Sequence, residues 1–213
     1  MKRGFFIVFE GIEGAGKSVQ TGLLASRLRR AGYRVAVTRE PGGTRIGEQI
    51  RAVTHKPENV DLEPKAEAYL MTASRAQHVA EVIAPALKAG KIVISDRFVQ
   101  SSFAYKGYGR KLGAEVIEQL NKLAIGEIRP DLVLVLDLPV AVGLARRNGA
   151  VKVDRLDLEQ KDFYERARQG YLDLAKKDPN YYFVIDTTSS IEETAAQIWS
   201  IVKTALAKYN AQS

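Results

Sequence analysis

The chain has 213 residues, of which 46% are hydrophobic and 27% are charged, and its formal net charge is +7. This length and composition predict one soluble globular domain with a single core, and no apolar run is long enough to span a membrane. The absence of cysteine excludes disulfides and thiolate chemistry, and the presence of only two histidines argues against a histidine-rich metal site. Hard oxygen ligands remain available, and they suit magnesium.

The positive charge fits either a nucleic-acid surface or a site for phosphate-bearing small molecules. Basic runs such as 27–30 fall on segments with helical periodicity, which is typical of a solvated helix face, and no nucleic-acid-binding motif is present. The apolar run near the N-terminus ends at Glu10, which is too early for a signal peptide. We therefore expect a cytoplasmic protein with no nucleic-acid or membrane partner.

Apolar runs typical of strands alternate along the chain with helical patterns. Most of these runs are continuous, as expected for strands that are covered on both faces, and they lie at 5–10, 34–38, 91–96, 132–137 and 181–186. The alternation predicts an α/β fold with a mainly parallel sheet. Because no linker or internal repeat interrupts it, we expect 1–213 to form one domain, with a basic loop at about 145–156.

A phosphate-binding loop (P-loop) follows the first strand. Residues 11–18 match G-x-x-x-x-G-K-S/T at every fixed position, between a buried strand and an amphipathic helix. The glycines let backbone N–H groups point at phosphate oxygens, Lys17 should reach the β- and γ-phosphates, and Ser18 should bind Mg²⁺. The predicted ATP-binding residues are Gly11, Ile12, Glu13, Gly14, Ala15, Gly16, Lys17 and Ser18.

The P-loop indicates a nucleotide user but not its reaction, because GTPases, motor ATPases and small-molecule kinases share it. A GTPase should carry N-K-x-D, but the nearest string, at 121–124, lacks the aspartate and falls on a predicted helix. The chain is also too short for a large motor ATPase. The sequence favours a kinase; a nonenzymatic nucleotide-binding module with a basic nucleic-acid surface is the alternative.

The longest helical pattern runs from about 64 to 89. Pro64 suits the first helical turn, whereas Pro85 should bend the helix or remove a backbone hydrogen bond. Gly90 should end it.

Four further segments carry polar residues. They are T-R-E-P-G-G-T at 38–44, T-A-S-R at 72–75, the stretch at 96–105, and the end of the basic loop at 154–156. The carboxyl ends of parallel strands meet at one edge of a sheet. The segments after the second and third strands should therefore converge there with the P-loop.

At these residues the sequence resembles the thymidylate kinase family. The resemblance extends from 9–11 to 186–188, and R-E-P-G-G-T at 39–44 combined with D-R-F at 96–98 and S-F-A-Y at 102–105 is specific to that family. It implies a five-stranded parallel sheet flanked by helices on both faces, a basic lid and usually a homodimer. It also implies direct phosphoryl transfer from ATP to dTMP, with Mg²⁺, to give dTDP.

The resemblance also implies an acceptor site. Glu13 matches a contact to the sugar 3′-hydroxyl, and Arg51 and Arg97 match contacts to the acceptor phosphate. Arg75 matches a contact to a thymine carbonyl, and Asp96 would lie near magnesium, beside Ser18. The other dTMP-binding residues implied in this way are Glu40, Pro41, Met71, Ser102 and Tyr105.

Two positions depart from the family pattern. Met71 stands where many members carry an aromatic residue, so it either packs on the base or is a core methionine. Lys106 stands where many bacterial members carry glutamine. These departures leave open a related kinase with another acceptor, such as a deoxynucleoside or a modified pyrimidine monophosphate.

The charge that stabilises the transferred phosphoryl group should come from the lid. Some thymidylate kinases carry an arginine inside the P-loop, whereas this chain has Gly14 and Ala15 there. The basic residues of the lid are Arg146, Arg147, Lys152 and Arg155. We expect the catalytic set to be Lys17, Arg97, Arg147 and Arg155, with solvated surface charge as the alternative role of the two lid arginines.

Overall fold

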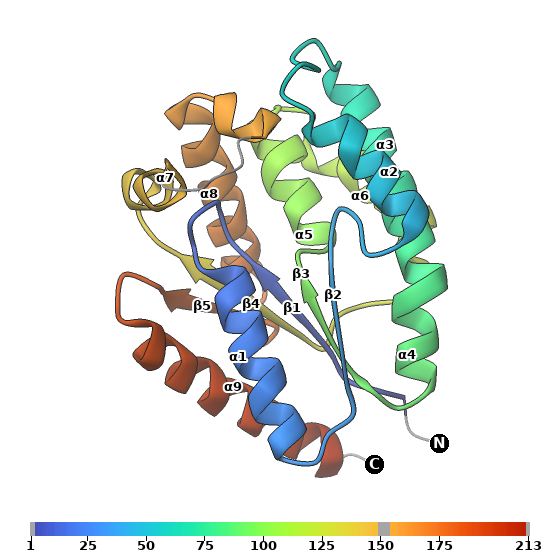
Figure 1. Cartoon of the computed structure of the whole chain (residues 1–213), viewed down its shortest axis with the longest axis vertical. Coiled ribbons are helices and arrows are strands. Elements are labelled where there is room, and N and C mark those ends of the chain that lie inside the picture. The colour runs from blue at the N-terminus through green and yellow to red at the C-terminus, as the bar shows by residue number, and fades with distance from the viewer. Residues whose placement is uncertain (1–2, 149–153, 212–213) are drawn as a thin grey trace.

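Five strands form one parallel sheet in the computed structural model, which describes residues 3–148 and 154–211 (Figure 1). The strand order is β2-β3-β1-β4-β5, and every pairing is parallel. The strands are β1 (Phe6–Glu10), β2 (Val35–Arg39), β3 (Ile92–Asp96), β4 (Leu132–Asp137) and β5 (Tyr182–Asp186). All five predicted strands are confirmed, with ends that differ by at most one residue.

Burial separates the central strands from the edge strands. Every residue of β1 is buried, and β3 and β4 are buried except at their last residue, whereas β2 and β5 are partly exposed. Continuous apolar sequence therefore marks the strands that helices cover on both faces. The core includes Phe6, whose ring meets that of Phe98 edge-on at a centroid distance of 5.2 Å.

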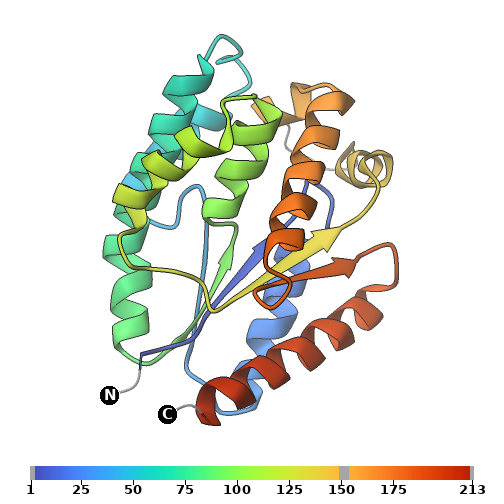
Figure 2. The same cartoon turned by 180° about the vertical axis from the view of Figure 1, so that it is seen from behind.

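Helices flank the sheet on both faces (Figures 1 and 2). On one face, α1 (Lys17–Arg30) packs beside α9 (Ile191–Ala211). On the other lie α4 (Ala84–Lys88), α5 (Val99–Ser102) and α8 (Lys161–Lys177), and beside them α2 (Arg45–His55), α3 (Pro64–His78) and α6 (Ala114–Ile125) pack against one another. The predicted fold class is confirmed.

The long predicted helix is one helical stretch whose winding changes before Pro85. α3 ends at His78, a π turn covers Val79–Ile83, and α4 follows. Ala84 donates its N–H to the carbonyl of Val79, five residues back, and the next residue, Pro85, has no N–H to donate. The predicted effect of Pro85 therefore takes the form of a local π turn.

The carboxyl ends of β1, β2 and β3 meet at one edge of the sheet. Asp96 pairs in register with Phe9 on one side and Arg39 on the other, which brings the segments after these strands together. Near the same edge lie α7 (Val140–Asn148), the 3₁₀ turn η3 (Arg155–Leu158) and the π-helical η2 (Phe103–Gly109). Residues 149–153 of the predicted lid, including Lys152, lie outside the described residues. In the described ranges, no helix is long and apolar enough to cross a membrane.

Candidate active site

Close backbone contacts shape the P-loop. Gly14 has a φ of 75°, and a Cβ atom on it would lie 2.1 Å from the carbonyl oxygen of Gly143 in α7. The contact is reciprocal, since a Cβ atom on Gly143 would lie 2.5 Å from the carbonyl oxygen of Glu13. Glycine is therefore needed here both for the left-handed backbone of the loop and for its close approach to α7.

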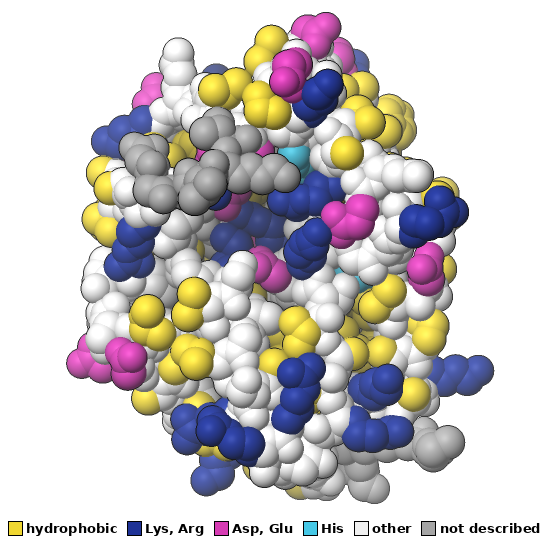
Figure 3. Space-filling view, in the orientation of Figure 1, with side chains coloured by type: hydrophobic (Ala, Val, Ile, Leu, Met, Phe, Trp, Pro, Cys, Tyr) yellow, Lys and Arg dark blue, Asp and Glu magenta, His cyan; other side chains and the backbone are white. Residues whose placement is uncertain are grey.

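A cavity of about 400 Å³ opens beside the P-loop. Figure 3 shows basic and acidic side chains gathered around this hollow. The predicted site residues on its walls are Glu13, Gly14, Gly16, Lys17, Ser18, Glu40, Pro41, Arg51, Met71, Arg75, Asp96, Arg97, Ser102, Tyr105 and Arg147. The predicted site residues that do not line it are Gly11, Ile12, Ala15 and Arg155.

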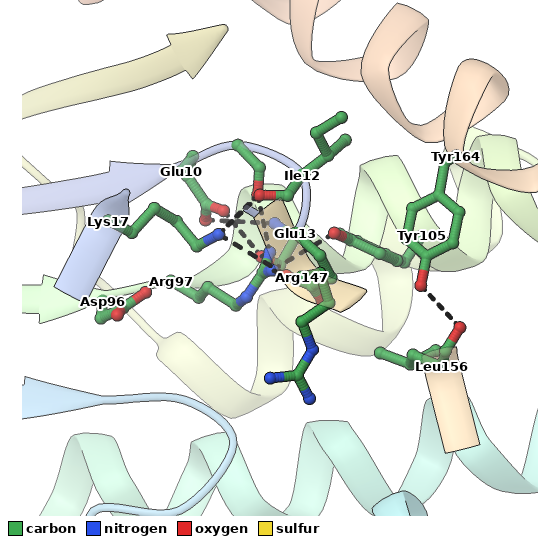
Figure 4. Close-up of polar contacts among 12 residues, drawn as sticks. Glu10, Ile12, Glu13, Lys17, Asp96, Arg97, Tyr105, Arg147, Leu156 and Tyr164 are labelled. Atoms are coloured by element: carbon green, nitrogen blue, oxygen red, sulfur yellow. Dashed lines mark hydrogen bonds and ion pairs between the residues drawn. The ribbon is translucent and has the colours of Figure 1, made fainter. Parts of the chain in front are cut away.

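Lys17 folds back over the P-loop from the start of α1 (Figure 4). Its Nζ donates to the carbonyl oxygens of Gly11 at 3.0 Å and Ile12 at 2.8 Å, and it lies 3.7 Å from Glu13 Oε2. These contacts give the carbonyl groups of Gly11 and Ile12 a role although their side chains do not line the cavity. Burial and the nearby Arg97 lower the pKa of Lys17.

Arg97 follows β3, and its side chain makes several hydrogen bonds and an ion pair (Figure 4). Its φ is 74°, which is unusual for a residue other than glycine. Its guanidinium pairs with the Glu13 carboxylate and donates to Ser101 Oγ at 3.1 Å. It also donates to the hydroxyls of Tyr171 at 3.0 Å and Tyr105 at 3.2 Å. The guanidinium plane is thereby fixed inside the cavity.

Opposite charges keep this pair ionised despite its burial. Burial raises the pKa of Glu13, but Arg97 and then Lys17 outweigh it and lower that pKa to about 2. Burial likewise works against the charge of Arg97, but the Glu13 carboxylate raises the pKa of Arg97 overall. At neutral pH Glu13 and Arg97 are therefore both ionised, with Lys17 beside them.

A second carboxylate, Glu10, lies behind Arg97 and was not predicted to be functional. It is fully buried and accepts hydrogen bonds from the N–H of Phe98 at 2.8 Å, Ser101 Oγ at 2.6 Å and the Tyr171 hydroxyl at 2.9 Å. Burial raises the pKa of Glu10. Because Ser101 and Tyr171 also contact Arg97, this network supports the guanidinium. Its one sequence signal is a charged residue that closes an otherwise apolar strand.

Arg75 forms the opposite wall of the cavity from α3. It donates to Glu40 Oε2 at 2.7 Å, to Ser102 Oγ at 2.8 Å and to the Phe98 carbonyl at 3.0 Å, and it also contacts Asn121. These contacts use four of the five N–H groups that a guanidinium carries. The side chain is 4% exposed, so its orientation is fixed by protein contacts.

Glu40 anchors the loop that follows β2. It precedes Pro41 through a cis peptide bond, and its Oε1 lies 2.9 Å from Nδ1 of the buried His78. The Nε2 atom of His78 lies 2.6 Å from Thr38 Oγ1. From α2, Arg51 donates to the Pro41 carbonyl at 3.2 Å. The loop is thus held from α2 and α3 while it lines the cavity.

Ser18 and Asp96 bring two hard oxygen donors together. Ser18 Oγ donates to Asp96 Oδ2 at 2.7 Å, at the junction of α1 and β3. Among residues 3–148 and 154–211, no group of three or more acidic or histidine side chains could hold a metal ion. The pair fits Mg²⁺, which commonly takes few protein ligands and completes its coordination with water and phosphate oxygens.

The lid arginines occupy different places. Arg147 donates Nε and Nη2 to the two carboxylate oxygens of Asp157, both at 2.8 Å, and it lines the cavity. Arg146 donates to the Thr187 carbonyl at 3.0 Å. Arg155 departs from its predicted place: its Nε donates to the Thr54 carbonyl at 2.9 Å, its Nη2 lies 2.6 Å from Glu67, and it does not line the cavity.

Known proteins are similar to this chain over most of its length. The family model described as thymidylate kinase matches residues 9–198. The thymidylate kinase of Geobacter sulfurreducens is 47% identical over 205 residues, covering 93% of this chain and 96% of the relative. That of Desulforudis audaxviator is 48% identical over 204 residues, covering 95% and 92%. The chain belongs to the thymidylate kinase family.

A solved structure of the family agrees with the fold. Thymidylate kinase from Ehrlichia chaffeensis is 32% identical, covers 94% of this chain and 99% of its own, and superposes with a TM-score of 0.76. Thymidylate kinases phosphorylate dTMP to dTDP with ATP. The predicted family, fold and enzyme class are therefore confirmed, and the kinase is favoured over the nonenzymatic module.

The cavity wall also carries His55, which was not among the predicted site residues, and Lys106, which departs from the family pattern. Burial, Arg51 and Lys106 lower the pKa of His55 to about 3, so its imidazole is neutral at physiological pH. Lys106 is buried, and its Nζ lies 2.9 Å from Glu67. Met71 is half-buried on the same cavity wall, which favours a contact with the base over a purely core position. No sequence motif marks His55.

Proposed function

We propose that this chain transfers the γ-phosphoryl group of ATP directly to the phosphate of dTMP, with Lys17 and Arg97 as its principal cations. The observation that carries the proposal is the arrangement of both cations around Glu13 in one cavity beside the P-loop. Phosphoryl transfer is catalysed mainly by positioning and by neutralising charge on the moving group. A site with two fixed cations supports that chemistry.

Lys17 and the P-loop amides bind the ATP phosphates in this proposal. The ammonium exchanges its contacts with the Gly11 and Ile12 carbonyls for phosphate oxygens. Arg97 clamps the acceptor phosphate through its planar fork, and Arg51 adds a second contact. Glu13 keeps Arg97 oriented and accepts a hydrogen bond from the sugar 3′-hydroxyl.

The base binds against the Arg75 wall. Since four N–H groups of Arg75 have protein partners, the remaining one is free to meet a thymine carbonyl. Ser102 and Tyr105 contact base and sugar, Glu40 and Pro41 shape the pocket, and Met71 packs on the base. Ser18 and Asp96 hold Mg²⁺, which when bound neutralises charge on the ATP phosphates.

Arg147 is the lid residue that we propose to stabilise the transferred group, since it lines the cavity and Asp157 fixes its guanidinium. The contacts of Arg155 favour an anchoring role over a catalytic one. Residues 1–213 form one kinase domain, with its lid at about 145–156. The enzyme acts in the cytoplasm, where its nucleotide substrates are found.

We also propose a homodimer. Exposed apolar side chains occur on three helices that pack against one another, namely Val53 on α2, Tyr69 on α3, and Val116 and Leu123 on α6. A cluster of exposed apolar residues on neighbouring elements is typical of an interface. A second copy of the chain that packs through the same helices would cover them symmetrically.

A different pyrimidine monophosphate is the second candidate acceptor, because His55 and Lys106 add polar groups to the cavity wall. The test is coupled ADP release with ATP and Mg²⁺ against dTMP, dUMP, dCMP, UMP, AMP and thymidine. Preference for dTMP supports the proposal, and preference for another acceptor replaces it. Lys17→Ala is the control and should abolish turnover without unfolding the chain.

A further inference from the structure

A buried cluster of charges lies next to the acceptor cavity and takes no part in the proposed reaction. At its centre is Glu67 on α3, which is 1% exposed. Its Oε1 lies 2.9 Å from Lys106 Nζ and 2.6 Å from Arg155 Nη2, and its Oε2 lies 3.3 Å from Arg110 Nε. Burial raises the pKa of Glu67, but Lys106 and Arg155 outweigh it and lower that pKa to about 2.

On one side, Glu67 is linked to residues that line the acceptor pocket. Glu67, Met71 and Arg75 are spaced four residues apart on α3, so they lie along one face of that helix. Met71 and Arg75 line the cavity, and so does Lys106, which pairs with Glu67. The carboxylate therefore does not line the cavity itself but holds Lys106, which does.

On the other side, Glu67 holds the described end of the lid. Arg155 is the first residue of η3, and its neighbours Asp154 and Leu156 line the cavity. The same turn carries Asp157, which holds the guanidinium of Arg147 in α7 through two hydrogen bonds of 2.8 Å.

A contact from α8 also fastens η3: the Tyr164 hydroxyl donates to the Leu156 carbonyl at 2.6 Å (Figure 4). Tyr164 belongs to α8. The ion pair of Arg155 with Glu67 connects η3 directly to α3, and the hydrogen bond from Arg155 Nε to the Thr54 carbonyl connects it to α2.

We propose that Glu67 is a positioning residue for phosphoryl transfer. Its carboxylate fixes the position of Arg155 relative to the acceptor pocket, and through η3 it also fixes the position of Arg147. This inference rests on the proposed role of Arg147 in the reaction. A misplacement of about 1 Å can cost on the order of 100-fold in rate. If η3 is not held beside the acceptor pocket, water can also compete for the phosphoryl group.

The test compares three variants of the full chain, each of which replaces one charged group by an amide. Glu67→Gln removes the central charge. Arg155→Gln removes the lid anchor, together with the hydrogen bond from Nε to the Thr54 carbonyl, and leaves Glu67 paired with Lys106 and Arg110. Glu165→Gln is the control, because Glu165 Oε1 lies 3.9 Å from Lys161 Nζ in α8 and belongs to an exposed pair outside the Glu67 cluster.

Two rates are measured: dTMP-dependent ADP formation, and ADP formation without an acceptor. For Glu67→Gln and Arg155→Gln we expect kcat with dTMP to fall by about 10-fold to 100-fold. The ratio of acceptor-independent to dTMP-dependent turnover should rise at least several-fold, while KM for ATP stays within about twofold. Glu165→Gln should match the wild type in all three quantities.

The double variant Glu67→Gln/Arg155→Gln tests whether the two residues act together. If Glu67 acts through Arg155, the double variant should be no slower than the slower single variant, because both changes break one link. A merely structural role would instead leave the turnover ratio unchanged. Thermal unfolding identifies any variant that fails to fold, and Arg155→Gln then decides alone.

Folded Glu67→Gln or Arg155→Gln with kcat and turnover ratio near those of the wild type would overturn the positioning role and leave the proposed function intact. If the wild-type chain formed no ADP with dTMP and ATP, this result would instead contradict the proposed function, and the positioning role with it.

Discussion

At the scale of single residues, Arg97 is the most constrained side chain of the site. Its left-handed backbone costs on the order of 1–3 kcal/mol for a residue other than glycine. Contacts with Glu13, Ser101, Tyr105 and Tyr171 determine its orientation and offset that cost. A phosphate that enters the cavity therefore meets a guanidinium that is already oriented.

Replacing Arg97 tests this pre-oriented clamp. For Arg97→Ala we expect kcat/KM for dTMP to fall on the order of 100-fold or more, because a fixed charge at the acceptor phosphate is lost. KM for ATP should change much less. Steady-state kinetics with each substrate varied in turn measures both effects, and near-normal use of dTMP would contradict the assignment.

His55 gives a prediction about pH. Its pKa is about 3 in the folded chain and near 6.5 when unfolded, so the unfolded chain takes up this proton first as pH falls. The stability that His55 contributes is complete above pH 6.5 and is lost as pH falls toward 3. His55→Gln should therefore flatten the fall in unfolding free energy between pH 7 and pH 4, by up to about 1.4 kcal/mol per pH unit. Denaturant unfolding at a series of pH values measures this, and parallel curves would refute it.

At the scale of elements, the contact between the P-loop and α7 couples the phosphate cradle to the lid. Gly143→Ala would place a Cβ atom 2.5 Å from the Glu13 carbonyl, so the loop or α7 must shift. We expect a loss of about 1–3 kcal/mol in stability, together with reduced turnover.

Gly22→Ala is the control for that change. Gly22 is exposed in α1, and a Cβ atom on it would meet no atom within 4 Å. Alanine should therefore raise the free energy of unfolding by about 1 kcal/mol, because it favours the helix over glycine. Equal effects of the two changes in thermal unfolding would contradict the packing argument.

Local patterns carried the prediction of the elements, whereas contacts between distant residues could not be predicted. The strands were predictable because burial on both faces demands continuous apolar sequence, and the P-loop because its chemistry lies within eight consecutive residues, 11–18. Arg155 was assigned to catalysis because its basic loop suggested a lid; only the fold reveals Glu67 beside it. Pro85 predicted a distortion of the helix, but the sequence did not predict that this distortion would be a π turn at Val79–Ile83.

At the scale of the whole molecule, exposed apolar side chains on α2, α3 and α6 are the basis for the proposed dimer. Leu123 is 92% exposed, and it lies seven residues after the exposed Val116, on the same face of α6. Leu123→Glu combined with Tyr69→Glu should shift the mass in solution from dimer to monomer, because each protomer would bring a charge into the interface.

Sedimentation or light scattering measures that shift. Ile191→Glu, at an exposed apolar position at the start of α9, is the control and should leave the mass unchanged. A wild-type chain that is monomeric at micromolar concentration would remove the dimer proposal.

The position of Lys17 has a consequence for inhibitors. Its ammonium already donates to the Gly11 and Ile12 carbonyls, so these carbonyl oxygens compete with any ligand for the hydrogen bonds of the lysine. A nucleotide recovers the cost of breaking these hydrogen bonds because its phosphates offer a charged acceptor in exchange. A neutral adenine mimic has nothing to offer the lysine and must draw its affinity from the base alone. We therefore expect compounds that place an anionic group in the P-loop to bind this site more tightly than neutral compounds.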